Sequence, residues 1–294
     1  MSRFKLHIEY DGTRYSGWQV QKNARTVQGE LLTAGRSVFG SSEVDIQGAG
    51  RTDAGVHALH QVAHLEVRTM LAPEIIRMKV NDLLPPDINL LEVEKAPAEF
   101  HARHDARARR YLYRISRRRT AFGKHYVWWV KDPLDAGRMR DAARHFVGMK
   151  DWRGFTDADP EQTSTRALID SVSIEEDADL ILIRVTGSHF LWKLVRRIVG
   201  VLVEAGRGTI SPEQISGLFS STSGFPSHHT APPSGLFLED VAYDSPPQTS
   251  VGIRGNRLFV DDPGNKGKDP SWQKTKSSSR WSASGRSSNR TSKS

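Results

Sequence analysis

The segment with the clearest chemical potential is the glycine-rich run GAGRTDAGVHA at residues 48–58. Glycines on both sides of Arg51 and Asp53 leave the backbone free to turn sharply and to approach another molecule closely. A carboxylate presented there can act as a nucleophile, a base or a charge partner. An Asp-x-Gly segment is nevertheless most often only a turn. The spacing matches neither GxGxxG nor a P-loop, which argues against a nucleotide-binding fold.

Three histidines in and after this run, His57, His60 and His64, raise the possibility of a metal site. On a helix they would share one face. The flanking alternation of polar and apolar residues instead predicts a strand, with His57 on the opposite face from the other two. We therefore expect structural, hydrogen-bonding histidines and no metal. Cysteine is absent, which excludes disulfides, thiolate metal sites and cysteine nucleophiles.

Basic residues are concentrated in two places. Eight Arg and one Asp lie between Arg103 and Arg119, with Tyr111 and Tyr113 among them. This run is either a solvated strand face or a phosphate-binding surface, and the tyrosines favour the second interpretation. Residues 266–294 hold five Lys, three Arg and one Asp, so they supply +7 of the net charge of +8, and residues 1–265 carry 8 − 7 = +1. A nucleic-acid surface outside the tail must therefore be a local patch.

The elements that would position these residues follow from apolar periodicity, caps and turn residues. Strands are predicted at 4–10, 44–48, 60–67, 88–93, 109–116, 169–175, 180–186 and 236–243. Helices are predicted from the Thr26 cap to residue 39, at 73–82, 133–146 and 189–204, and after Ser211. Because a similar order of elements occurs twice, we expect two α+β halves with largely antiparallel sheets.

The expected domains are an N-terminal half over residues 1–117, which carries the Asp53 loop, and a C-terminal half over residues 118–245. Residues 246–294 form a basic, Ser-rich tail with too few aliphatic residues for a core, and we expect them to be disordered. No apolar run approaches the roughly 20 residues that a membrane helix needs, and no signal peptide is evident. We expect a cytoplasmic protein without membrane association.

The GRTDAGVHA run resembles the active-site segment of the tRNA pseudouridine synthase A (TruA) family. Further stretches resemble that family in the same order: EYDGT at 9–13, YSGWQ at 15–19, QKNARTVQ at 21–28, FHAR at 100–103, RYLYRI at 110–115, FL at 190–191, LVRRIVG at 194–200, GRG at 206–208, APPSGL at 231–236 and VAY at 241–243. The resemblance covers about residues 4–243, and its motifs are highly specific together. The tail has no counterpart in it.

The resemblance implies a role for each matched residue. Asp53 aligns with the family's catalytic aspartate, which attacks or assists at the target nucleotide while the glycosidic bond breaks. Arg51 matches an arginine that fills the base stack when the uridine is flipped out, and Tyr111 matches a tyrosine that stacks against the flipped base. Arg196 matches an arginine that pairs with the aspartate and keeps it ionised at neutral pH. From the residues alone, Tyr111 would be a core strand residue and Arg196 an exposed helix residue.

For the whole chain, the resemblance implies an isomerase that converts uridine to pseudouridine in the anticodon stem-loop of tRNA. Isomerisation involves neither net redox change nor group transfer, so no cofactor and no metal are expected. The implied fold has two ferredoxin-like (RRM-like) halves joined through a mostly antiparallel sheet around a basic active-site cleft, and the family is usually homodimeric.

Two other function classes stand beside this one: an RNA-binding protein or tRNA chaperone without catalysis, and a DNA-repair glycosylase. The sequence also departs from the family pattern at His60, where glycine is common, at KDW 150–152, where HDF is usual, and at Leu194, where methionine is usual. None of these positions is one of the four candidate site residues. They bear on loop detail and substrate choice.

Overall fold

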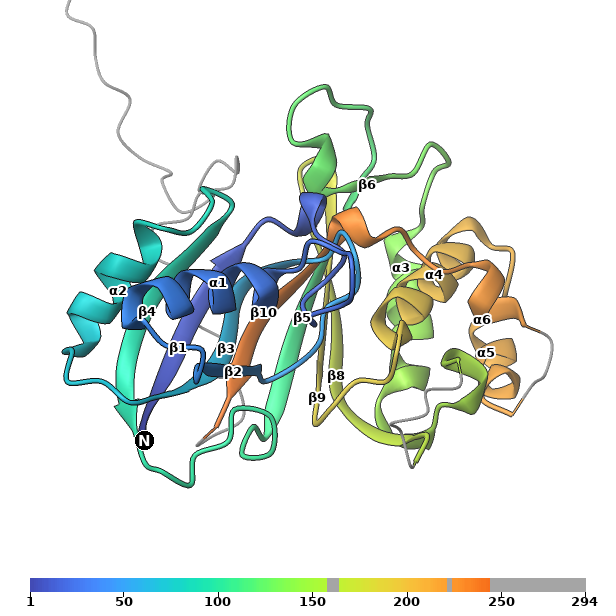
Figure 1. The fold of residues 1–294 in the computed structure, drawn as a ribbon. Helices are drawn as coiled ribbons and strands as arrows, with labels where there is room; N and C mark the ends of the chain where they lie inside the picture. Colours follow the sequence, from blue (N-terminus) through green and yellow to red (C-terminus); the bar gives the residue numbers. More distant parts are fainter. Residues whose placement is uncertain (158–163, 221–223, 244–294) are drawn as a thin grey trace, which may run out of the picture. The chain divides into compact units, whose positions relative to one another are not determined.

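In the computed structural model, one sheet of ten strands organises the described part of the chain, which comprises residues 1–157, 164–220 and 224–243 (Figure 1). The strands are β1 (Ser2–Tyr10), β2 (Asp45–Gly48), β3 (His57–Val67), β4 (Ile88–Ala96), β5 (Ala108–Ser116), β6 (Trp128–Trp129), β7 (Gly148–Asp151), β8 (Arg166–Asp177), β9 (Leu180–Gly187) and β10 (Leu236–Ala242). All of these lie in one compact unit that spans residues Met1–Val251.

The order of strands in the sheet is β4-β1-β3-β10-β5-β9-β8-β7, with β2 paired to β3 and β6 paired to β5. Neighbours are antiparallel except for β10 with β3 and β6 with β5. The last described strand, β10, thus lies between β3 and β5, with Leu238 opposite Ala58 on one side and Tyr111 on the other. This arrangement brings the start of β3, and the loop before it, close to the middle of β5.

Helices gather at both ends of the sheet (Figure 1). α1 (Val27–Phe39) and α2 (Pro73–Asn81) pack together near β2 and β4, and α3 (Ala136–Ala143) contacts β8. α4 (Leu194–Arg207), α5 (Pro212–Leu218) and α6 (Phe225–His228) complete the second group. The Thr26 hydroxyl accepts a hydrogen bond of 3.2 Å from the Gly29 amide, as expected for the cap of α1, because the first amides of a helix have no partner within it.

Two predicted helices begin later than expected. The helix predicted at 189–204 begins at Leu194, because Lys193 has a φ of 60° and a left-handed residue cannot continue a right-handed helix. The helix predicted at 133–146 begins at Ala136, since Asp135 acts as its cap by accepting hydrogen bonds from the Gly137 and Arg138 amides. The strand predicted at 60–67 begins earlier, at His57, so the glycine-rich loop is shorter than its sequence suggests.

The expected mixed α+β fold with a large, mostly antiparallel sheet is confirmed. The predicted tail at residues 246–294 lies outside the described residues. Across the described ranges, every helix is too short or too polar to span a bilayer.

Candidate active site

The loop between β2 and β3, residues 49–56, is held in place by hydrogen bonds from side chains of the sheet. Gln61 on β3 donates a hydrogen bond of 2.9 Å from Nε2 to the Gly50 carbonyl oxygen. Arg109 on β5 donates one of 2.8 Å from Nη2 to the Ala49 carbonyl oxygen. Gln61 and Arg109 are both almost fully buried. The backbone of the loop is therefore positioned by groups that cannot move without repacking the sheet.

The segment after β1 fixes the other side of the loop. The Trp18 amide donates to the Thr52 carbonyl oxygen at 3.1 Å, and the hydroxyls of Tyr10 and Thr52 lie 2.8 Å apart. Gly17 has a φ of 90°, and a Cβ there would lie 2.5 Å from the Thr52 carbonyl oxygen. Only glycine permits this close approach of two backbones. Asp53 thus follows a residue held on both its backbone and its side chain.

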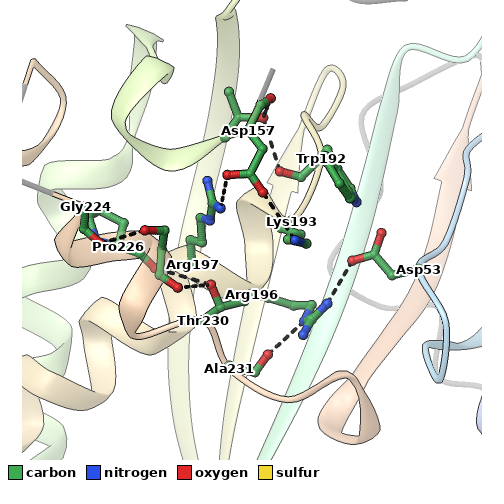
Figure 2. A network of polar contacts seen from close by, with 12 residues as sticks. Asp53, Asp157, Trp192, Lys193, Arg196, Arg197, Gly224, Pro226, Thr230 and Ala231 are labelled. Atoms are coloured by element: carbon green, nitrogen blue, oxygen red, sulfur yellow. Dashed lines mark hydrogen bonds and ion pairs between the residues drawn. The ribbon is translucent and has the colours of Figure 1, made fainter. Parts of the chain in front are cut away.

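Asp53 forms an ion pair with Arg196, near the start of α4 (Figure 2). Arg196 Nη1 donates to Asp53 Oδ2 at 3.0 Å, and the side chains are 15% and 24% exposed. Arg196 Nε also donates to the Ala231 carbonyl oxygen at 2.7 Å, and the Ala231 amide donates to the Arg196 carbonyl oxygen at 3.1 Å. The contact between Asp53 and Arg196 that the family resemblance implies is present. The guanidinium is oriented by backbone and not by charge alone.

Tyr111 lies on β5 beneath the loop and is 7% exposed. A Cβ added at Gly50 would lie 4.0 Å from the Tyr111 hydroxyl, which places the phenol directly under the loop. Burial raises the pKa of Tyr111 to about 12, and the Asp53 carboxylate contributes to the same shift. The phenol therefore remains protonated and can donate a hydrogen bond throughout the physiological pH range.

Arg51 occupies a different position on the loop. It is exposed and lines a pocket of about 270 Å³ together with Gly48, Gly50 and Arg103. Trp18, Gln19, Gln28, Asp45, Gln47 and His101 complete the lining. The structure thus groups three of the predicted residues, Asp53, Arg196 and Tyr111, and places the fourth at a neighbouring polar pocket.

The helix turn that presents Arg196 is itself held by an acidic residue that the sequence did not single out. Asp157 accepts a hydrogen bond of 2.5 Å from Arg197 Nη2 and one of 3.2 Å from Lys193 Nζ (Figure 2). Arg197 is 3% exposed, and Lys193 is the left-handed residue before α4. Thr156 donates a further hydrogen bond of 3.2 Å to the Trp192 carbonyl oxygen. Residues on both sides of Arg196 are therefore tied to one short segment.

The arginine run on β5 is mostly structural. Arg109, Arg110 and Arg114 are each less than 10% exposed. Arg109 donates to four carbonyl oxygens, and Arg110 pairs with Glu239 at 3.0 Å. Arg114 lies 5.9 Å from the centre of the Phe237 ring. Both interpretations of the run, a solvated face and a phosphate surface, are wrong for these three residues, while Arg103, Arg107 and Arg119 are exposed.

The three histidines all lie on β3, and each has a hydrogen-bond partner of its own elsewhere in the chain. His57 Nε2 donates to the His125 carbonyl oxygen at 3.1 Å, and His64 Nδ1 accepts from the Ala102 amide at 3.1 Å. His60 Nδ1 lies 2.9 Å from Asp240 Oδ1. The described residues do contain one group of possible metal ligands, but it includes none of these three histidines. His7, Glu92 and Glu94 have ligand atoms within 4.8 Å of one another. This group lies on β1 and β4.

Comparison with known proteins gives consistent matches. The family model described as tRNA pseudouridine synthase matches residues 7–105 and 142–244. The tRNA pseudouridine synthase A of Geotalea uraniireducens (strain Rf4) is 40% identical over 245 residues, and that of Rhodopseudomonas palustris (strain BisA53) is 39% identical over 247 residues. Each match covers 83% of this chain and 100% of the relative. The corresponding protein of Nitrobacter winogradskyi is 38% identical over 260 residues, which cover 87% of this chain and all of the relative.

The two ranges that the family model matches include the Asp53 loop and the start of α4. A family model that matches most of a chain, together with relatives near 40% identity along their full length, identifies a family. The chain belongs to the tRNA pseudouridine synthase family.

Proposed function

We propose that the protein isomerises uridine to pseudouridine in the anticodon stem-loop of tRNA, with Asp53 as the indispensable carboxylate and without a cofactor. The observation that carries the proposal is the Asp53 carboxylate itself, presented on a backbone-fixed loop, paired with Arg196 at 3.0 Å and close enough to the buried Tyr111 phenol to raise its pKa. The family match and the names of the relatives support the same activity.

The reaction conserves the atoms of the nucleoside. The N1–C1′ bond breaks, the base rotates, C5 bonds to C1′, the proton on C5 leaves to solvent, and N1 takes up a proton from solvent. The carboxylate of Asp53 can attack the ribose, attack the base or remove a proton from C2′, and each of these steps requires its charged form. Arg196 balances that charge and holds the carboxylate in one orientation.

The target uridine must leave its stack to reach Asp53. In the proposed reaction, Arg51 enters the space that the uridine vacates, and Tyr111 stacks against the extruded base. The exposure of Arg51 and its position at a polar pocket beside the loop support the first role. The position of Tyr111 beneath Gly50 supports the second. The protonated phenol can also supply a proton during the rearrangement.

The proposal extends to the architecture. The two halves are residues 1–117 and 118–245, each ferredoxin-like. The helices near β2 and β4 and those near β8 form separate groups, which supports this division. We also propose a cytoplasmic homodimer, in line with the family resemblance.

The decisive experiment uses tRNA that carries tritium at C5 of uridine. Wild-type protein should release tritium and yield pseudouridine on nucleoside analysis, whereas Asp53→Asn should retain less than about one per cent of the rate, in line with loss of a central catalytic group. Its tRNA affinity should stay within a few-fold, because phosphate contacts dominate binding. Glu43→Gln, an exposed carboxylate just before β2, is the control.

The same assay separates the other function classes. Free base in the product would indicate a glycosylase. Wild-type protein that binds tRNA but yields no pseudouridine would indicate an RNA-binding protein without this activity. Asp53→Asn activity close to that of the wild type would remove Asp53 from the reaction.

A further inference from the structure

A segment between β5 and α3 carries large apolar side chains into solvent. Phe122 is 86% exposed and Trp129 is 42% exposed. Phe122 lies at a tight turn, where Gly123 adopts a φ of 66° and the Tyr126 amide donates to the Gly123 carbonyl oxygen at 2.9 Å. In Figure 1 the part of this segment before β6, drawn in green, extends beyond the end of β5. Large apolar side chains that are exposed together on one ordered segment mark a candidate interaction surface.

The same segment is strongly basic. Residues 117–131, the aromatic–basic loop, contain Arg117, Arg118, Arg119, Lys124 and Lys131 and no acidic residue. At its base Arg117 pairs with Glu176, and Arg118 pairs with Asp179 at 2.5 Å. The other three cations are exposed, and within the described ranges they form no ion pair with a carboxylate. The guanidinium of Arg119 lies 5.8 Å from the centre of the Trp129 ring. The loop therefore combines exposed aromatic rings with positive charge that no described carboxylate neutralises.

The aromatic–basic loop is anchored next to the candidate active site. The His125 carbonyl oxygen accepts a hydrogen bond of 3.1 Å from Nε2 of His57, the first residue of β3 after the Asp53 loop. The Tyr126 hydroxyl donates to Asp11 Oδ2 at 2.9 Å. The Tyr126 ring packs edge-on against the His57 ring at 5.3 Å. These part-buried contacts hold the loop in place without using the side chains of Phe122, Trp129, Arg119, Lys124 or Lys131.

We propose that the aromatic–basic loop is a second RNA-binding surface, which engages unpaired nucleotides of the substrate outside the target uridine. Phe122 and Trp129 would stack on nucleobases, and Arg119, Lys124 and Lys131 would neutralise phosphates. Paired RNA hides its base faces within the helix, so open aromatic rings select unpaired nucleotides. Cations beside stacking rings are the usual composition of single-strand binding surfaces. This inference rests on the proposed function only for the identity of the RNA as tRNA.

The test compares the tRNA affinities of Phe122→Ala and Trp129→Ala, measured by filter binding, with that of the wild type. We expect each substitution to weaken binding about tenfold, as expected for loss of one base–aromatic stack. Phe122→Tyr keeps the ring and should bind like the wild type. Met70→Ala removes another fully exposed apolar side chain, away from the loop, and is the matched control. Affinity for a blunt RNA duplex without unpaired bases should be the same for all variants.

Other outcomes would overturn the inference. Unchanged tRNA affinity in both alanine variants would contradict it. So would an equal loss of affinity for the duplex, because that would indicate general damage to the protein. Sedimentation of the free protein tests whether a second copy of the chain, and not RNA, occupies this surface. If Phe122→Ala changes the oligomeric state but leaves RNA affinity unchanged, the surface joins two copies of the chain. Since binding is measured without turnover, a wild type that binds tRNA but forms no pseudouridine would contradict the proposed function and leave this inference standing.

Discussion

The guanidinium of Arg196 donates a hydrogen bond of 3.0 Å to the carboxylate of Asp53, although the two residues lie 143 positions apart in the chain. The same guanidinium donates at 2.7 Å to the Ala231 carbonyl oxygen. One side chain thus connects the loop before β3, the first turn of α4 and the segment that leads to β10. The candidate site depends on the relative positions of these three segments.

Arg196→Lys tests whether the fork geometry of the guanidinium matters beyond its charge. A single ammonium group cannot reproduce the planar fork that spans Asp53 and Ala231. We expect the rate of tritium release at saturating tRNA to fall by about 10²-fold, as for loss of a positioned electrostatic contact. Arg207→Lys, at the far end of α4, is the control and should behave like the wild type. A wild-type rate for Arg196→Lys would show that charge alone suffices.

Tyr111→Phe removes the phenol and keeps the ring. We expect tRNA affinity to be retained and the single-turnover rate to fall by about 10²-fold, the lower range for a proton-transfer group. Because burial raises the pKa of Tyr111 to about 12, the phenol remains protonated from pH 7 to pH 10. The ratio of wild-type to Tyr111→Phe rate should therefore be constant over that range. A ratio that declines towards one as the pH approaches 10 would contradict the buried, neutral phenol.

Arg51→Ala tests the flipping role against a simple phosphate contact. We expect the single-turnover rate at saturating enzyme to fall far more than the affinity for tRNA. Arg103→Ala removes the other exposed arginine of the same pocket. It should weaken binding, with a decrease of about 0.7 to 0.9 in the slope of log K against log salt concentration. If the Arg51→Ala defect disappears at high enzyme concentration, Arg51 is also only a phosphate contact.

Asp157→Asn tests the support of the α4 start. Loss of the carboxylate weakens its contacts to Lys193 and to the buried Arg197, which flank Arg196. We expect the maximal rate to fall about tenfold or more, because a displacement of about 1 Å in a catalytic group can cost 10²-fold. The KM for tRNA should change little, and Asp157→Glu should recover part of the rate.

The control for that variant is Asp151→Asn. Asp151 lies in the same stretch of chain, and it pairs with Arg153 and Thr165 instead of with α4. The Asp151→Asn substitution should lower thermal stability but leave the maximal rate unchanged. Equal maximal rates in the two variants would show that Asp157 stabilises the fold and does not position Arg196.

Local interactions explain what could be predicted from the sequence by itself. Thr26 marks the start of α1 because a cap satisfies amides only three residues away. Alternating residues gave β1 and β9 their correct places within about two residues, since side-chain direction in a strand reverses at each step. The GRTDAGVHA run indicated the candidate loop because its glycines and its family resemblance are both properties of a short stretch.

The tertiary structure alone decided which distant segments meet. Insertion of β10 between β3 and β5 depends on strand pairing and on the packing of the whole sheet, and no local propensity encodes it. The same holds for Arg109, an ordinary member of a basic run by sequence, which in the fold donates to the Ala49 carbonyl oxygen and fixes the loop. Asp157 is a third case, because its partners on α4 approach it only after folding. The burial of a side chain and the identity of its partner are set only when the chain folds. The charges in the sequence therefore could not distinguish the arginines that pair within the protein from those that remain exposed.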